Sequence, residues 1–208
     1  MARHKKSERE KVLSETRRLL LQAATEEFAR EGYLGANINR ISKAAGFAKG
    51  TIYNYFPSKR ALMLALIDEV AKAHLDFIVA QAGQEKDPGR RLERFFEAGF
   101  AFVSNYFAQA RVMINNIYGP DVEFKQYMYE AYQPMFQFVS RDIVAAGIAG
   151  GVFRQVDLDA TALLLMTIYL GTGSQVDEAG RTWLDPGQVA AFTLSALRRE
   201  DQTLAKEE

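Results

Sequence analysis

The 208-residue chain contains no cysteine, which excludes disulfide bonds, thiolate zinc sites, cysteine nucleophiles and thiol-based redox sensing. It has two histidines, and the sequence shows no metal-ligand cluster and no nucleophile paired with a base. No apolar run approaches the length of a membrane span, and the N-terminus is charged rather than signal-like. We therefore expect a cytoplasmic protein with no membrane contact, no metal and no cofactor. An all-helical enzyme is the least favoured class.

The charges are distributed unevenly, although the net charge is zero. Residues 1–60 carry 13 Lys and Arg against 6 Asp and Glu, whereas residues 61–208 carry 13 against 20. A basic N-terminal third on an acidic remainder is typical of a protein in which only one part meets a polyanion. The acidic part also discourages nucleic acid from binding elsewhere.

The stretch from Asn37 to Lys59 contains two short segments with helical apolar spacing, separated by Gly46. The apolar positions are Ile38, Ile41 and Ala45 before the glycine, and Phe47, Ile52 and Phe56 after it. Asn37 is a good N-cap for the first segment, and Gly46 suits the left-handed conformation that ends a helix. Two helices of about seven residues joined by such a turn make a helix-turn-helix.

The outward face of the second segment carries a lysine, hydroxyls and an amide but no carboxylate. Lysine, hydroxyl and backbone N–H groups bind phosphate oxygens, and Asn54 is a candidate base reader with adenine as its best partner. The alternative is an ordinary helical hairpin with a solvated polar face. The expected DNA-binding residues are Asn39, Lys49, Gly50, Thr51, Tyr53, Asn54, Tyr55 and Lys59.

These residues belong to a longer pattern that resembles the DNA-binding domain of the TetR family of bacterial transcriptional repressors. The matching positions are Arg17, Leu20, Leu21, Ala23, Ala24, Phe28, Gly32, Tyr33, Ile41, Ala45, Gly46, Gly50, Thr51, Ile52, Tyr53, Tyr55, Phe56, Lys59 and Leu62. Ser42 departs from the family's usual alanine. Ala48 replaces the usual Ser or Thr cap, so we expect the second helix to lack that cap. Such a loss typically costs about 1 kcal/mol of helix stability.

The resemblance and the helical periodicity together predict an all-α protein of about nine helices. We expect a basic flexible arm over residues 1–13 and a three-helix DNA-binding domain over 14–60, whose first helix begins at about Glu15. A larger effector-binding and dimerisation body follows over 61–200, with a loose tail over 201–208. Asp87, Asp157 and Asp185 are expected helix caps, and Pro134 is expected to kink a long helix over 121–146. His74 is expected to be a lone solvated histidine.

Aromatic residues are concentrated between positions 95 and 138, which favours either a well-filled core or a small-molecule pocket. The tyrosines favour the pocket, because each buried hydroxyl needs a partner. The family resemblance implies an effector among these helices, here a small apolar or aromatic molecule, and Asn116 is a further polar candidate. The expected ligand-binding residues are Phe96, Phe100, Arg111, Asn115, Tyr118, Tyr127, Tyr132, Gln133 and Tyr169.

The resemblance also implies that the last two long helices form the interface of a homodimer. Its expected residues are Leu163, Met166, Leu170, Val189, Phe192 and Leu197. The leading hypothesis is a homodimeric repressor that binds a palindromic operator in double-stranded DNA and is released by the effector. The alternative is the same scaffold regulated by a protein partner instead of a small ligand.

Overall fold

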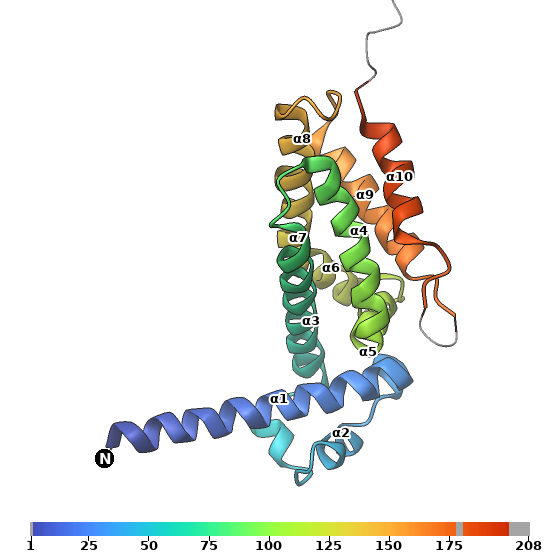
Figure 1. The fold of residues 1–208 in the computed structure, drawn as a ribbon. Coiled ribbons are helices and arrows are strands. Elements are labelled where there is room, and N and C mark those ends of the chain that lie inside the picture. Colours follow the sequence, from blue (N-terminus) through green and yellow to red (C-terminus); the bar gives the residue numbers. More distant parts are fainter. Residues whose placement is uncertain (1, 178–180, 200–208) are drawn as a thin grey trace, which may run out of the picture. The chain divides into compact units, whose positions relative to one another are not determined.

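The computed structural model describes residues 2–177 and 181–199, and within them the fold is all-α (Figure 1). The helices in chain order are α1 (Ala2–Gly35), α2 (Ile38–Ala44), the 3-10 helix η1 (Thr51–Asn54), α3 (Lys59–Ala82), α4 (Pro88–Asn105), α5 (Phe107–Ile117), α6 (Val122–Ala131), α7 (Gln133–Gln137), the π-helix η2 (Phe138–Ala145), α8 (Ala146–Ala149), α9 (Leu158–Gly173) and α10 (Pro186–Leu197). When α7, η2 and α8 are counted as one continuous helix and the short 3-10 helix η1 is left out, the described residues hold nine helices and no β-strand, which confirms the predicted fold class.

The described chain forms two compact units. The first comprises the residues up to Val70 together with Ala108–Met128, and the second comprises Ala71–Phe107 together with the described residues from Tyr129 onward. The boundary falls inside α3, so this helix contributes its first half to one unit and its second half to the other. None of the helices in the described part of the chain is long and apolar enough to span a membrane.

The first unit is built on the apolar face of α1. Leu20, Ala24 and Phe28 recur at helical spacing and are buried, as are Ile41 of α2 and Ile52 of η1. Burying each large apolar side chain stabilises the fold by about 1.5–3 kcal/mol. The amphipathic spacing of α1 therefore assembles the helix-turn-helix against it, as predicted.

The second unit packs α4 against α10 and α9 against η2 (Figure 1). Its three long helices begin where the sequence predicts, because the side chains of Asp87, Asp157 and Asp185 accept hydrogen bonds from the backbone N–H groups of Arg90, Ala160 and Gln188. Asp87 and Asp185 are each followed by a proline in the first helical turn, where the missing N–H costs nothing.

Two predicted boundaries are wrong. The first helix begins at Ala2 rather than near Glu15, so residues 2–13 are helical. This stretch is rich in Lys, Arg and Glu, which are good helix formers. Pro134 does not kink one long helix, because α6 ends at Ala131 and the proline lies in the first turn of the separate helix α7. The expected tail over 201–208 lies outside the described residues.

Candidate nucleic-acid interface

The turn between α2 and η1 has the geometry that its sequence predicts. The side-chain oxygen of Asn37 accepts a hydrogen bond from the N–H of Asn39 at 2.8 Å and caps α2. Gly46 has φ +81°, which L side chains rarely adopt, and it turns the chain after α2. The N–H of Phe47 then donates to the carbonyl of Ser42 at 2.9 Å and closes the turn.

The second segment is shorter than predicted. Instead of an α-helix of about seven residues, Thr51–Asn54 form one 3-10 turn. Gly50 at its N-cap offers no side-chain hydrogen bond, and the expected capping position holds Ala48. Ile52 and Phe56 are nevertheless buried, at 1% and 4% exposure. The burial of these two side chains adds to the backbone hydrogen bonds of the turn, such as the one from Phe56 N–H to the carbonyl of Ile52 at 2.9 Å.

The expected DNA-binding residues lie on α2, in and beside η1, and at the start of α3, and each is exposed or half-buried. Tyr53 is 50% exposed, and Asn39, Lys49, Gly50 and Asn54 are also exposed. Thr51, Tyr55 and Lys59 are half-buried. The charged residues between Gly32 and Ile67 are all cations, namely Arg40, Lys43, Lys49, Lys59 and Arg60. A surface with cations, hydroxyls and amides but no carboxylate is electrostatically matched to a phosphate backbone.

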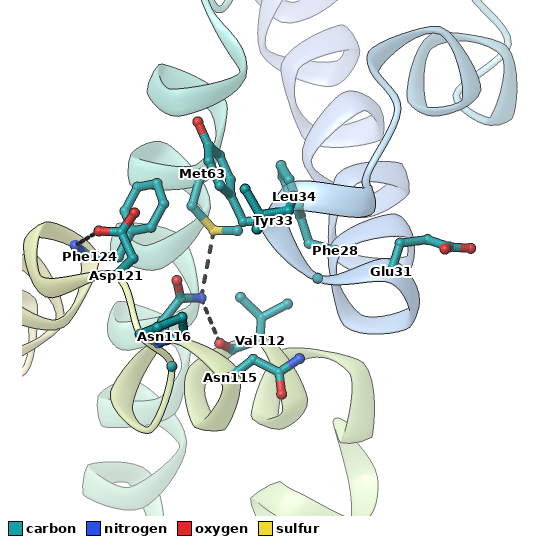
Figure 2. Close-up of a pocket in the computed structure, with 13 residues that line it drawn as sticks. Phe28, Glu31, Tyr33, Leu34, Met63, Val112, Asn115, Asn116, Asp121 and Phe124 are labelled. Carbon is teal, nitrogen blue, oxygen red and sulfur yellow. Dashed lines mark hydrogen bonds between the residues drawn. The ribbon is translucent and has the colours of Figure 1, made fainter.

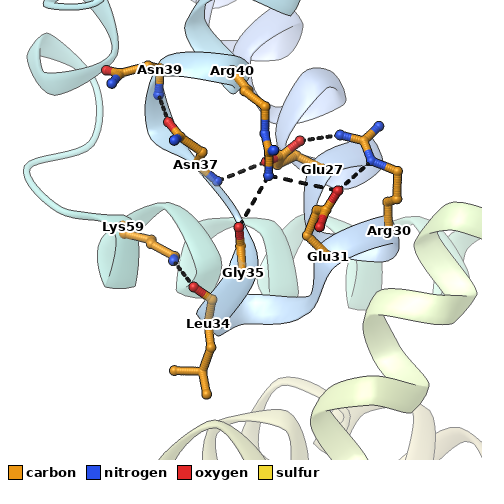
Figure 3. A network of polar contacts seen from close by, with 9 residues as sticks. All are labelled: Glu27, Arg30, Glu31, Leu34, Gly35, Asn37, Asn39, Arg40 and Lys59. Carbon is orange, nitrogen blue, oxygen red and sulfur yellow. Dashed lines mark hydrogen bonds and ion pairs between the residues drawn. The ribbon is translucent and has the colours of Figure 1, made fainter.

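The buried carboxylate of Glu27 ties α1 to α2 (Figure 3). Glu27 is 4% exposed, and its Oε1 accepts hydrogen bonds from the backbone N–H of Asn37 at 2.8 Å and from Nε of Arg40 at 2.7 Å. Its Oε2 accepts from Nη2 of Arg30 at 2.5 Å. Glu27 thus binds the N-terminal end of α2 and one exposed cation of that helix.

Lys59, at the start of α3, is anchored in the same region (Figure 3). Its Nζ donates to the carbonyl of Leu34 at 3.1 Å and lies 5.0 Å from the centroid of the Tyr33 ring. Partial burial lowers the pKa of Lys59, while the nearby carboxylate of Glu27 acts in the opposite direction. The ammonium group has three N–H donors, so it can retain Leu34 and still reach a phosphate.

The expected ligand-binding residues are divided between the two units. Phe96, Phe100, Tyr132 and Tyr169 are buried in the second unit, where Gln133 is exposed. Arg111, Asn115, Tyr118 and Tyr127 belong to the first unit. There, Arg111 and Asn115 are exposed, Tyr118 is 60% exposed, and Tyr127 donates a hydrogen bond to Asp68 at 2.8 Å.

His74 is not solvated, contrary to expectation, but is completely buried in the second unit. Its Nδ1 lies 3.2 Å from the hydroxyl of Tyr132, its Nε2 lies 2.8 Å from the hydroxyl of Tyr169, and its ring stacks on Phe102. Burial lowers the pKa of His74 to about 3 and raises the pKa of both tyrosine hydroxyls. A Cβ on Gly99 would lie 2.4 Å from the Tyr169 ring, so glycine makes room for it. The two tyrosines therefore satisfy a buried imidazole and fill the core.

The expected dimer-interface residues divide by exposure. Leu163 and Phe192 are 59% and 69% exposed on α9 and α10, whereas Met166, Val189 and Leu197 are buried within the unit and Leu170 is half-buried. Leu164, which the sequence analysis did not select, is 63% exposed beside Leu163. A shallow pocket of about 370 Å³ on this face is lined by Thr167, Ile168, Gly171, Thr172, Leu184, Gln188, Val189 and Phe192.

Glu27 and Arg40 were not among the residues predicted from the sequence. A signal for Glu27 was present, because it lies seven residues after Leu20 and therefore falls on the buried stripe of α1. A carboxylate on an apolar stripe requires partners, and Arg40 and the N–H of Asn37 are those partners.

Comparison with known proteins defines the class. The sequence profile described as "Bacterial regulatory proteins, tetR family" matches residues 20–66. The HTH-type transcriptional regulator EthR of Mycolicibacterium smegmatis is 31% identical over 169 residues, covering 79% of this chain and 74% of EthR. The chain belongs to the TetR family and is a DNA-binding transcriptional regulator.

Solved structures share the fold. FadR from Bacillus subtilis in complex with stearoyl-CoA superposes with a TM-score of 0.73 at 20% identity, covering 85% of this chain and 95% of FadR. AibR in complex with isovaleryl coenzyme A and operator DNA superposes with a TM-score of 0.70 at 17% identity, covering 88% of this chain and 98% of AibR.

Proposed function

We propose that the protein is a homodimeric repressor that binds a palindromic operator and is released when a small apolar or aromatic effector binds. The DNA-binding part of this proposal is supported by the chemistry of the surface of α2 and η1. Its exposed residues offer cations, hydroxyls and amides without a carboxylate, and the buried Glu27 holds that surface in place. In this proposal Lys49, Lys59 and Tyr53 bind phosphates, and Asn54 reads a base edge.

The homodimer is supported by the exposed apolar face of α9 and α10. Leu163, Leu164 and Phe192 are each more than half exposed to solvent. Several large apolar side chains exposed on two helices of one unit favour an interaction surface, because monomers rarely expose large apolar patches. A two-fold interface here would present two copies of η1 to DNA. To enter successive major grooves on one side of the duplex, the two copies must lie about 34–36 Å apart or a multiple of one helical turn.

Binding of a small effector is supported by two proteins of the same fold, FadR with stearoyl-CoA and AibR with isovaleryl coenzyme A and operator DNA. For release, an effector must prefer the conformation that does not bind DNA, since equal affinity for both conformations shifts nothing. A protein partner in place of a small effector is the second candidate. A pocket of small-molecule size in the first unit, described below, favours the effector.

Selection of bound sequences from a random double-stranded DNA pool tests the proposal directly. We expect an inverted repeat, with half-sites separated as the dimer geometry requires. The Asn54→Ala variant should lose its preference for one base per half-site. Recovery of no enriched sequence would refute operator binding, and a site without two-fold symmetry would refute the palindromic arrangement.

The dimer is tested by light scattering on Phe192→Asp. A charge at the centre of an apolar interface should give monomers and abolish operator binding. Gln81→Asp, which adds the same charge at an exposed position of α3, serves as the control and should remain dimeric. A dimer that survives both Phe192→Asp and Leu163→Asp would place the interface elsewhere.

A further inference from the structure

A pocket in the first unit lies against the segment that anchors Lys59 (Figure 2). Its volume is about 480 Å³, within the range of small-molecule sites. The C-terminal end of α1, the side chain of Met63 on α3, the end of α5, the turn at 119–121 and Phe124 on α6 form its walls. Phe28, Tyr33 and Phe124 make the lining aromatic, and Tyr33 meets Phe124 edge-on at 4.7 Å.

One polar group in this lining has an unused acceptor. Asn116 is 7% exposed, and its Nδ2 donates to the carbonyl of Val112 at 2.8 Å and approaches the sulfur of Met63 at 3.7 Å. The bond to Val112 fixes the orientation of the amide, because only the nitrogen can donate to a carbonyl. The amide oxygen of Asn116 accepts no hydrogen bond from any residue in the described ranges (Figure 2). This oxygen has no protein donor, so it can accept a hydrogen bond from a donor that enters the pocket.

The charged groups of the lining restrict the charge that a ligand can carry. Glu31 and Asp121 bring carboxylates to the rim, and no lysine or arginine is among the described residues that line the pocket. Of the arginines next to this lining in the chain, Arg30 pairs with Glu31 and Arg60 pairs with Glu123. An anionic group would therefore meet like charge, whereas an apolar or aromatic molecule with a hydrogen-bond donor would satisfy Asn116.

Two residues that line the pocket also contact Lys59, one of the expected DNA-binding residues. Tyr33 and Leu34 line it, and the same two residues hold the ammonium of Lys59 through the ring and the carbonyl. A ligand that shifts Tyr33 or Leu34 must alter the position of Lys59 at the start of α3. This connection lies entirely within the first unit and needs no change elsewhere in the chain.

We infer that this pocket binds a small apolar or aromatic molecule that carries a hydrogen-bond donor and no negative charge, and that its occupancy lowers operator affinity through the contacts of Tyr33 and Leu34 with Lys59. The regulatory half rests on the proposed function. The binding half does not, because it depends only on the lining and on Asn116.

Binding is tested on the full chain with 2-naphthol as the probe, with naphthalene and 2-naphthoate as matched controls. Naphthalene keeps the ring but lacks the donor, and naphthoate carries a negative charge. We expect 2-naphthol to bind more tightly than either control and to shift the side-chain amide resonance of Asn116 in a ¹H–¹⁵N spectrum. Asn116→Leu should lower the affinity for 2-naphthol about five- to tenfold, which corresponds to the loss of one hydrogen bond, and should leave the affinity for naphthalene unchanged. Asn105→Leu, at an exposed position of α4, is the control variant.

Equal binding of 2-naphthol and naphthalene, tighter binding of naphthoate, or no binding of 2-naphthol would overturn the site. Regulation is tested by measuring affinity for the selected operator with and without 2-naphthol. We expect at least about a fivefold loss of affinity, within the usual range of coupling between two sites, and a smaller loss in Asn116→Leu. Binding at Asn116 without a change in operator affinity would overturn the regulatory half. Failure to select any operator would instead refute the proposed function, while the 2-naphthol titration would still decide the site.

Discussion

Replacing Glu27 by glutamine tests whether one buried carboxylate positions the DNA-binding surface. Glutamine keeps the shape of the side chain but removes the charge and one of the two acceptor oxygens. The remaining oxygen cannot serve the N–H of Asn37, Arg40 and Arg30 together, although the glutamate does so across both oxygens. The new NH₂ group also faces at least one guanidinium, which offers it no acceptor.

The magnitude follows from the burial of each partner. The bond from the Asn37 N–H changes from charge-assisted to neutral or is lost, which costs about 1 kcal/mol. The side chains of Arg40 and Arg30 are 51% and 61% exposed, so water replaces the carboxylate and each pair contributes only about 0.5 kcal/mol. Glu27→Gln should therefore lower the free energy of unfolding by about 2 kcal/mol. If the loosened end of α2 must be ordered on DNA, the same amount lowers operator affinity by up to about 30-fold.

Urea unfolding measures the first quantity, and titration with the selected operator measures the second. Glu26→Gln is the matched control, because Glu26 precedes Glu27 on α1 but is exposed. It should change the free energy of unfolding by no more than about 0.5 kcal/mol. If the two variants are equally stable and bind the operator equally, Glu27 does not position the interface.

Three further predictions concern single groups. Because burial lowers the pKa of His74 to about 3 while the unfolded chain titrates near the ordinary value, the unfolded state binds one more proton between these pH values. Stability should fall as the pH drops below about 6.5, by about 1.4 kcal/mol per pH unit from this group, and urea unfolding of His74→Phe should show a shallower slope. Ser42→Ala should raise the free energy of unfolding by about 1 kcal/mol, because the fully buried Oγ of Ser42 has no partner among the described residues; a loss of stability would reveal one. Lys59→Ala should reduce the salt slope of operator binding by about 1, whereas Lys72→Ala should not; equal slopes would remove Lys59 from the interface.

The parts of the fold that were predictable from sequence are those determined by local spacing. The stripe of Leu20, Ala24 and Phe28, the cap at Asn37 and the turn at Gly46 each involve residues within a few positions of one another. Periodicity and capping rules apply at this range, and they were sufficient for the helix-turn-helix. The second segment was too long in the prediction, because apolar spacing does not distinguish one 3-10 turn from a short α-helix.

The parts that were not predictable depend on partners far away in the chain. His74 meets Tyr132 and Tyr169 across separations of 58 and 95 residues, which helical spacing on α3 cannot indicate. The tyrosine content between residues 95 and 138 signalled that buried hydroxyls needed partners but did not identify the histidine. The pocket beside Asn116 is of the same kind, because its walls come from α1, α3, α5 and α6.

The short recognition segment explains why contacts behind it can control DNA binding. Four residues of 3-10 helix without a side-chain cap have little stability of their own, and a missing cap alone costs about 1 kcal/mol. Burial of Ile52 and Phe56 contributes about 1.5–3 kcal/mol each and therefore outweighs that loss. The side chain of Phe56 also contacts α1, because the guanidinium of Arg17 lies 5.6 Å from the Phe56 ring. The position of the segment therefore depends on the helices against which it packs. A change at the C-terminal end of α1, where Glu27, Tyr33 and Leu34 lie, alters the residues that position the DNA-binding residues. It does not alter the DNA-binding residues themselves. Affinity for DNA can therefore change without any substitution in the surface that touches it.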